Sequence, residues 1–281
     1  MAITSFGGLG PGSQPLEEDG GELQYMEMPK GMLTFARPIL PEKENVAGLR
    51  AALAVLSAVA DSLAAFSPGR PNAVHDLAGL DHANLALIDQ ALGEGEVSVI
   101  CGGDVQAQES VLAGVWRVRR TGANGQLASD TIEVGTFPSA VMARAFAESR
   151  DVLAAPAAYP AGIFNAPPLI AEINEHIRRT APGVEPHVIN LSLLPHTEED
   201  FALLDSLLGQ GPVVVLSRGY GNCRVTTTAT RDVWWVRFYN STEALILNTI
   251  EVTALPEVVS AAPEDIADSH GRLLEILEVY R

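Results

Sequence analysis

The sequence predicts an α+β protein built by tandem duplication of one small αβαβββα domain with a mainly antiparallel sheet, because three blocks of its first half recur in its second half. The recurring pairs are residues 87–99 with 203–215, 115–119 with 233–237, and 131–134 with 249–252. The first pair is displaced by 116 residues and the other two by 118. Units of solenoid proteins run about 20–50 residues, so a displacement this long indicates two copies of a whole domain.

Composition and the repeat together predict four segments. Residues 1–44 are rich in glycine, proline and acidic side chains and are expected to form a flexible acidic N-terminal segment. The first α+β repeat domain is expected at residues 45–153, followed by an alanine- and proline-rich linker at 154–168. The second α+β repeat domain is expected at 169–281.

Apolar spacing and turn residues predict the elements of each repeat. In the first repeat we expect helices at 45–66, 82–92 and 138–149, and strands at 73–77, 97–101, 115–120 and 131–134. In the second repeat we expect helices at 169–179, 197–209 and 263–280, and strands at 188–193, 213–216, 224–228, 233–239 and 245–252. Gly93 and Gly209 are expected to end a helix in each copy. Thr197 and Asp200 resemble a capping box with Asp in place of the usual Glu or Gln.

The charge of the chain limits its partners. The 281 residues carry a formal net charge of −17 at pH 7. Nucleic acid is therefore an unexpected partner, because phosphate binding requires a basic face. An acidic chain suits a basic polypeptide partner, or its charge serves only solubility. Both interpretations stay open at this point.

The sequence also predicts a cytoplasmic protein without direct membrane insertion. Residues 1–14 lack the basic region and the apolar region of a secretory signal. The longest apolar stretch, near residues 51–66, is interrupted by Ser57, Asp61 and Ser62 and is too short to span a bilayer. Two cysteines are too few for a disulfide framework or a cysteine-based zinc site.

No arrangement of residues predicts catalysis. None of the six histidines forms the i, i+4 pair of a zinc hydrolase. The glycines at 8, 10 and 12 have no preceding strand and no following Lys-Ser/Thr, so they do not form a phosphate loop. We therefore expect a non-enzymatic protein with no catalytic residues, no resident cofactor and no metal site.

A turn in the second repeat is the best candidate for partner contact. Its candidate residues are Gly219, Tyr220, Gly221, Asn222, Cys223 and Arg224. Neighbouring arginines would lower the pKa of the Cys223 thiol and favour a redox-sensitive or metal-contacting thiolate. The alternative is that Cys223 serves as a small apolar residue in a β-hairpin.

The three tryptophans separate into two groups. Trp116 and Trp234 occupy equivalent repeat positions and are expected in the core. Trp235 follows directly and must point to the opposite face of its strand. It is a seventh contact candidate, as an exposed aromatic for protein recognition, unless it packs under the C-terminal helix.

Several motifs resemble those of the HupH/HyaF-type hydrogenase expression/formation proteins, in particular the branch called HoxQ. The resemblance extends from the N-terminal segment to the C-terminal helix. The motifs that carry it lie at residues 10–15, 92–99, 108–119, 189–191, 194–195, 219–221 and 256–265.

The resemblance implies an accessory role in the maturation of a [NiFe]-hydrogenase. It implies a chaperone for the iron–sulfur small-subunit precursor with its twin-arginine signal peptide, with a thioredoxin-like hydrogenase co-chaperone as a further partner. Two alternatives stay open. One is an iron–sulfur or thiol-dependent cofactor-assembly protein acting through Cys223, and the other is a scaffold that bridges accessory proteins.

Overall fold

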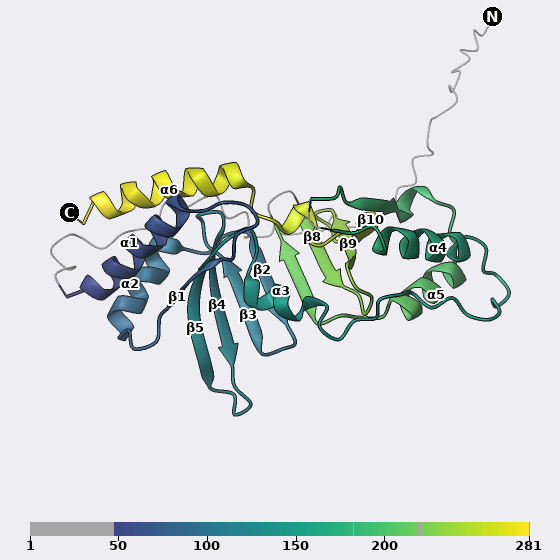
Figure 1. Cartoon of the computed structure of the whole chain (residues 1–281), viewed down its shortest axis with the longest axis horizontal. Helices are drawn as coiled ribbons and strands as arrows, with labels where there is room; N and C mark the ends of the chain where they lie inside the picture. Colours follow the sequence, from purple (N-terminus) through teal and green to yellow (C-terminus); the bar gives the residue numbers. More distant parts are fainter. Residues whose placement is uncertain (1–47, 182, 219–220, 281) are drawn as a thin grey trace, which may run out of the picture. The chain divides into compact units, whose positions relative to one another are not determined.

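The computed structural model describes residues 48–181, 183–218 and 221–280 (Figure 1). The first repeat contains α1 (Arg50–Ala64), β1 (Ala73–Asp76), α2 (His82–Leu92), β2 (Val97–Cys101), β3 (Val105–Glu109), β4 (Val115–Thr121), β5 (Leu127–Val134) and α3 (Ser139–Ala145). The second repeat contains α4 (Ala166–Ile177), β6 (His187–Asn190), η2 (Leu191–Leu193), α5 (Glu198–Leu208), β7 (Val213–Ser217), β8 (Asn222–Thr227), β9 (Val233–Tyr239), β10 (Leu245–Val252), η3 (Glu257–Val259) and α6 (Pro263–Glu278).

One antiparallel sheet runs through both repeats. Its ten strands lie in the order β1-β5-β4-β3-β2-β7-β8-β9-β10-β6. The repeats join at β2 and β7, where Val99 lies opposite Val215, and Val97 opposite Ser217. Because β2 and β7 are equivalent strands, this pairing relates the copies by a local two-fold about the Val99–Val215 pair. The predicted α+β duplication with a mainly antiparallel sheet is confirmed.

The duplication extends to individual hydrogen bonds. The indole Nε1 of Trp116 donates to the Gly135 carbonyl at 3.0 Å, and that of Trp234 donates to the Thr253 carbonyl at 3.1 Å. Both rings are fully buried, as their equivalent positions predict. A buried indole N–H needs an acceptor, so each copy retains the same backbone partner for its tryptophan.

Helices pack on the sheet in both repeats, and α3 packs on its central part. In the first repeat α1 and α2 bury Leu56 and Ile88 against the sheet, and in the second repeat α4 and α5 bury Ile173 and Leu204. The C-terminal helix α6 follows the second repeat in sequence but packs on α1 and belongs to the same core cluster as that helix. Figure 1 shows α6, in yellow, running alongside α1.

The structure adds one strand to the expected first repeat and shortens one helix. Strand β3 has the sequence Val-Gln-Ala-Gln-Glu, whose polar residues and single β-branched side chain give a weak strand signal. The helix expected at 138–149 ends at Ala145. Phe146 then packs edge-to-face on Trp234 with the ring centroids 5.3 Å apart. The residue that follows the helix therefore contributes a contact between the repeats.

Asp200 is a buried carboxylate that caps two helices. Its Oδ2 accepts the Thr197 N–H at 3.2 Å, while Thr197 Oγ1 accepts the Asp200 N–H at 3.0 Å, which completes the capping box of α5. Its Oδ1 accepts the N–H groups of Phe164, Asn165 and Ala166 at 2.9–3.0 Å, at the start of α4. One side chain therefore holds the N-termini of α4 and α5 together.

Among the described residues, no helix is both long and apolar enough to cross a membrane.

Asp200→Asn is expected to lower the free energy of unfolding by about 2–4 kcal/mol, because an amide keeps only one acceptor oxygen for these donors. Burial by itself would raise the pKa of Asp200, but hydrogen bonds from Ala166, Phe164 and Thr197 lower it to about 2. The stabilisation is therefore present above about pH 4 and is lost as the pH falls towards 2. Denaturant titration at pH 7 measures the loss, with Asp205→Asn on the exposed face of α5 as the control. Equal stability of the two variants would contradict this role.

Candidate functional site

The predicted contact turn lies in the β7–β8 hairpin. Gly219 and Tyr220 lie outside the described residues. Gly221, with φ of +104°, leads into β8, where Asn222 and Arg224 are exposed and Cys223 is buried. The accessible part of this turn is thus polar, and its role in partner contact stays a prediction.

Cys223 is a structural thiol. Its side chain is 4% exposed and belongs to the core cluster that contains Trp116 and Trp234. Burial raises the pKa of Cys223 to about 12, and the charge of Glu251 adds to the increase. The expected lowering of the Cys223 pKa by neighbouring arginines is wrong, because burial raises this pKa and alternation along β8 points Arg224 to the opposite face. The interpretation as a small apolar residue in a hairpin is confirmed.

Cys101 is also fully buried, and burial raises the pKa of its thiol. Among the described residues, no group of three or more His, Cys, Asp or Glu side chains could hold a metal ion.

The expectation that Trp235 is an exposed aromatic is wrong. The side chain is 5% exposed, and its indole N–H donates to Asn248 Oδ1. The guanidinium of Arg237 lies 4.2 Å from the ring centroid. The ring belongs to the core beneath α4 and α5, and not beneath the C-terminal helix, because α6 packs on the first repeat.

A cavity of about 740 Å³ is the strongest candidate site in the part of the chain that the structure describes. Residues of both repeats line it, so we call it the inter-repeat cavity. Five of its lining residues are acidic: Glu96, Glu109, Glu251, Glu257 and Asp265. Its walls also include Val97, Val188 and Val259, and the described lining residues include no lysine, arginine or histidine. The cavity therefore combines apolar walls with an excess of negative charge.

Two of these carboxylates lie where the ionised form is destabilised. Burial raises the pKa of Glu109 to about 7, and Glu96 and Asp265 add to the increase, although the Gly114 N–H donates to Glu109 at 3.2 Å. Burial also raises the pKa of Glu251, with a further contribution from Glu257. A cation in the cavity would relieve both effects, because an opposite charge favours the ionised carboxylate.

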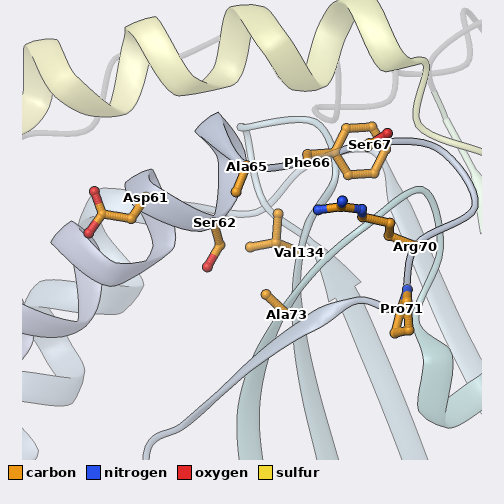
Figure 2. A pocket seen from close by; sticks show the side chains of 9 residues that line it. All are labelled: Asp61, Ser62, Ala65, Phe66, Ser67, Arg70, Pro71, Ala73 and Val134. Carbon is orange, nitrogen blue, oxygen red and sulfur yellow. The ribbon is translucent and has the colours of Figure 1, made fainter.

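A second pocket, of about 300 Å³, lies at the C-terminal end of α1 (Figure 2). Its lining includes Asp61, Phe66, Arg70 and Val134. Figure 2 shows Arg70 extending beneath the Phe66 ring, while Ala73 and Val134 form the opposite wall. One acidic and one basic side chain give this pocket no excess of charge, so it is the weaker candidate.

The sequence prediction missed the inter-repeat cavity. Its acidic residues are spread from position 96 to position 265 along the chain, and no local motif joins them. A signal was nevertheless present in the repeat, since Glu251 occupies the position that Glu133 occupies in the first copy. A glutamate at equivalent positions of two strands indicates that the two carboxylates should be compared with one another.

Glu109→Gln is expected to stabilise the protein at pH 8 by about 1–3 kcal/mol, because the neutral side chain keeps an acceptor for Gly114 and removes a buried charge. Its pKa rises from 4.5 to about 7 on folding. The destabilisation is therefore absent below about pH 4.5, grows as the pH rises from 4.5 to 7, and is complete above pH 7.

Thermal or urea unfolding at pH 5 and pH 8 checks this, with Glu275→Gln on the exposed face of α6 as the control. A gain at pH 5 as large as the gain at pH 8 would show that the charge of Glu109 is not the cause.

Comparison with known proteins gives matches along nearly the whole chain. The family model described as "HupH hydrogenase expression protein, C-terminal conserved region" matches residues 49–157 and again 163–280. These two segments correspond to the two halves of the duplication.

Similar proteins come from several bacteria. The chain is 50% identical to "Hydrogenase expression/formation protein HupH" of Rhodobacter capsulatus over 276 residues, which cover 98% of this chain and 96% of that protein. It is 44% identical to "Hydrogenase expression/formation protein HoxQ" of Cupriavidus necator, covering 96% and 95% of the two chains. It is 33% identical to "Hydrogenase-1 operon protein HyaF" of Escherichia coli, covering 99% and 97%. The chain therefore belongs to the family of HupH hydrogenase expression proteins.

Proposed function

We propose that this protein is a non-enzymatic accessory chaperone in the maturation of a [NiFe]-hydrogenase. It acts in the cytoplasm, where it holds the iron–sulfur small-subunit precursor before twin-arginine export, together with a thioredoxin-like co-chaperone. The role in hydrogenase maturation is supported by relatives that are named hydrogenase expression/formation proteins. The holding mechanism is supported by the surface of the protein itself.

The single observation that carries the holding function is the inter-repeat cavity. Five acidic side chains and apolar walls suit a polypeptide that carries both basic and apolar residues. With the net charge of −17, long-range attraction would speed the encounter with a basic precursor segment. Steering of this kind needs no catalytic group and suits a transient complex.

An exposed apolar surface in the second repeat offers a further contact. Phe164 is 70% exposed, Leu193 is 80% exposed and Leu194 is 42% exposed. The side chain of Asn165 donates to the Pro195 carbonyl, which brings the two segments that carry these residues together. We call Phe164, Leu193 and Leu194 the apolar tip. Exposed apolar side chains gathered in this way favour a surface that binds another polypeptide.

The thiol-dependent alternative has less support. A nucleophilic or metal-contacting cysteine needs an accessible thiolate, whereas Cys223 is buried with a pKa near 12. A cofactor-assembly protein or a scaffold that bridges accessory proteins remains a competing hypothesis, and the same experiment separates both from the chaperone.

The first test is an anaerobic pull-down of the tagged full-length protein from cells that make the hydrogenase, with mass spectrometry and iron analysis of the eluate. The expected result is uncleaved small-subunit precursor, with iron only when that partner is present. Recovery is expected to fall several-fold between about 50 and 500 mM salt, because charge attraction is screened. Iron on the isolated protein would support the assembly hypothesis, and accessory proteins without precursor would support the scaffold.

Leu193→Ser is expected to reduce precursor recovery several-fold at constant salt, because it removes apolar contact area from the apolar tip. Leu127→Ser is the matched control, since Leu127 is 59% exposed on the β5 hairpin of the first repeat. Equal recovery with both variants would exclude the apolar tip as a contact surface.

A further inference from the structure

Glu133 and Glu251 are equivalent residues of the two repeats, displaced by 118 positions. Each precedes the residue that closes its strand, Val134 of β5 or Val252 of β10. Both strands pair antiparallel with an edge strand, so that Val134 lies opposite Ala73 and Val252 lies opposite His187. The two carboxylates therefore occupy the same place in the fold, and their surroundings can be compared directly.

In the first repeat the Glu133 carboxylate accepts several hydrogen bonds. Glu133 is 2% exposed. Its Oε2 accepts from Asn72 Nδ2 at 3.0 Å, from the Ser139 N–H at 2.6 Å and from Ser139 Oγ at 2.7 Å. A buried carboxylate with several donors of this kind is a closed structural unit, and it leaves no room for a ligand.

In the second repeat the corresponding donors are missing. Pro186 precedes His187 where Asn72 precedes Ala73, and Glu257 stands 118 residues after Ser139. The proline side chain has no donor to match Asn72 Nδ2, and the glutamate side chain replaces the Ser139 hydroxyl with a second negative charge, so neither side chain replaces the lost donors. Among the described residues, the hydrogen bond to Glu251 comes from Thr249 Oγ1 at a long 3.4 Å.

Glu251, Glu257 and Pro186 all line the inter-repeat cavity. Glu109, which lines the same cavity, also departs from its repeat equivalent. That equivalent is Thr227, which is 1% exposed and accepts the Val213 N–H at 3.0 Å. At Glu251 the second copy lacks the side-chain donors of the first, and at Glu109 the first copy carries a carboxylate where the second carries a hydroxyl group. Both differences add an acceptor without a matching donor to the lining of the inter-repeat cavity. Hydrogen-bond donors of another molecule could therefore pair with these carboxylates.

The arrangement favours an organic cation over a metal ion. Within the described part of the chain, no three of these carboxylates converge closely enough to coordinate a metal ion. A guanidinium presents five N–H donors in a planar fork and can serve carboxylates that are spread apart. The apolar walls suit the methylene stem of the same side chain, and about 740 Å³ leaves room for neighbouring residues of a peptide.

We propose that the inter-repeat cavity binds an arginine of an extended client polypeptide, whose guanidinium supplies to Glu251 the donors that Asn72 and Ser139 supply to Glu133. The identity of the client as a maturing hydrogenase subunit rests on the proposed function, whereas the chemistry of the site does not. The arginine stem lies along the apolar walls, and Glu109 and Glu257 add to the attraction.

The test measures binding of a fluorescently labelled ten-residue peptide of alanine and serine with one central arginine to the full-length protein. The matched peptide carries citrulline, which has nearly the same shape without the charge. The arginine peptide is expected to bind at least about tenfold more tightly than the citrulline peptide, since charge-assisted hydrogen bonds are about twice as strong as neutral ones. Equal affinity of the two peptides would overturn the proposal.

Two variants locate the site. Glu251→Gln is expected to lower affinity for the arginine peptide about tenfold and to leave affinity for the citrulline peptide unchanged. The double variant Pro186→Asn with Glu257→Ser introduces the donors of the first repeat, and it is expected to abolish the preference for arginine while raising the unfolding midpoint. Asp205→Asn, a distant exposed carboxylate of the same repeat, is the control. Unchanged arginine preference in folded Glu251→Gln protein would overturn the proposal.

A further arm tests the chain's own basic residues as occupants. Lys30, Arg37 and Lys43 lie in the N-terminal segment. If replacing all three by glutamine raises affinity for the arginine peptide about tenfold or more, the cavity serves this chain's own segment, and the proposal of a client arginine fails.

The outcomes separate this inference from the proposed function. If the protein shows no preference for the arginine peptide but still recovers the precursor, the arginine site is rejected and the chaperone role is retained. If the arginine peptide binds at Glu251 but the pull-down contains no precursor, the arginine site is retained and the chaperone role is rejected.

Discussion

The pairing of β2 with β7 is the interaction on which the rest of the structure depends. It joins two copies of one domain into a single ten-stranded sheet, and it removes the exposed strand edge that each copy would otherwise present. The central core then forms from both copies, with Trp116 of one and Trp234 of the other in the same cluster. Neither half has a complete central core by itself. The inter-repeat cavity exists for the same reason, because both copies contribute its walls.

Duplication also explains how a cavity of this kind can arise. When two copies of a domain share one fold, either copy can keep the residues that the fold needs while the other changes. Glu133 retains its donors and closes the first repeat, whereas Glu251 has lost the equivalent donors and faces an open volume. The fold tolerates the second arrangement because the strand pairing around Glu251 is unchanged. Comparison within one chain thus identifies a site that no single motif defines.

Much of the fold could be predicted from the sequence, and the reasons are local. The recurrence of whole blocks predicts the duplication, and paired tryptophans predict the core. Gly93 and Gly209, with φ of 57° and 63°, end their helices at the predicted places. Strand β3 was missed because it has only two apolar side chains, Val105 and Ala107, and so short an alternation is a weak strand signal.

The site could be predicted much less well, because it depends on contacts between distant segments. The exposure of Trp235 could not be judged from its strand alone, since α4 and α5 cover that face. The cavity brings Glu96 and Asp265 to one volume across most of the chain length. Sequence spacing cannot predict that residues so far apart line one cavity until the pairing of the repeats is known.

The position of α6 has a consequence for the order in which the chain becomes functional during synthesis. The first repeat is made first, but Ile266, Leu273 and Leu277 belong to the same core as Leu56 and Ile88. The ribosome must therefore release the last helix before the earliest core can close, and such distant contacts form slowly. A nascent or prematurely terminated chain would expose the apolar face of α1. Only a chain that includes α6 has a complete first core, so a competent molecule can form only after α6 has been synthesised.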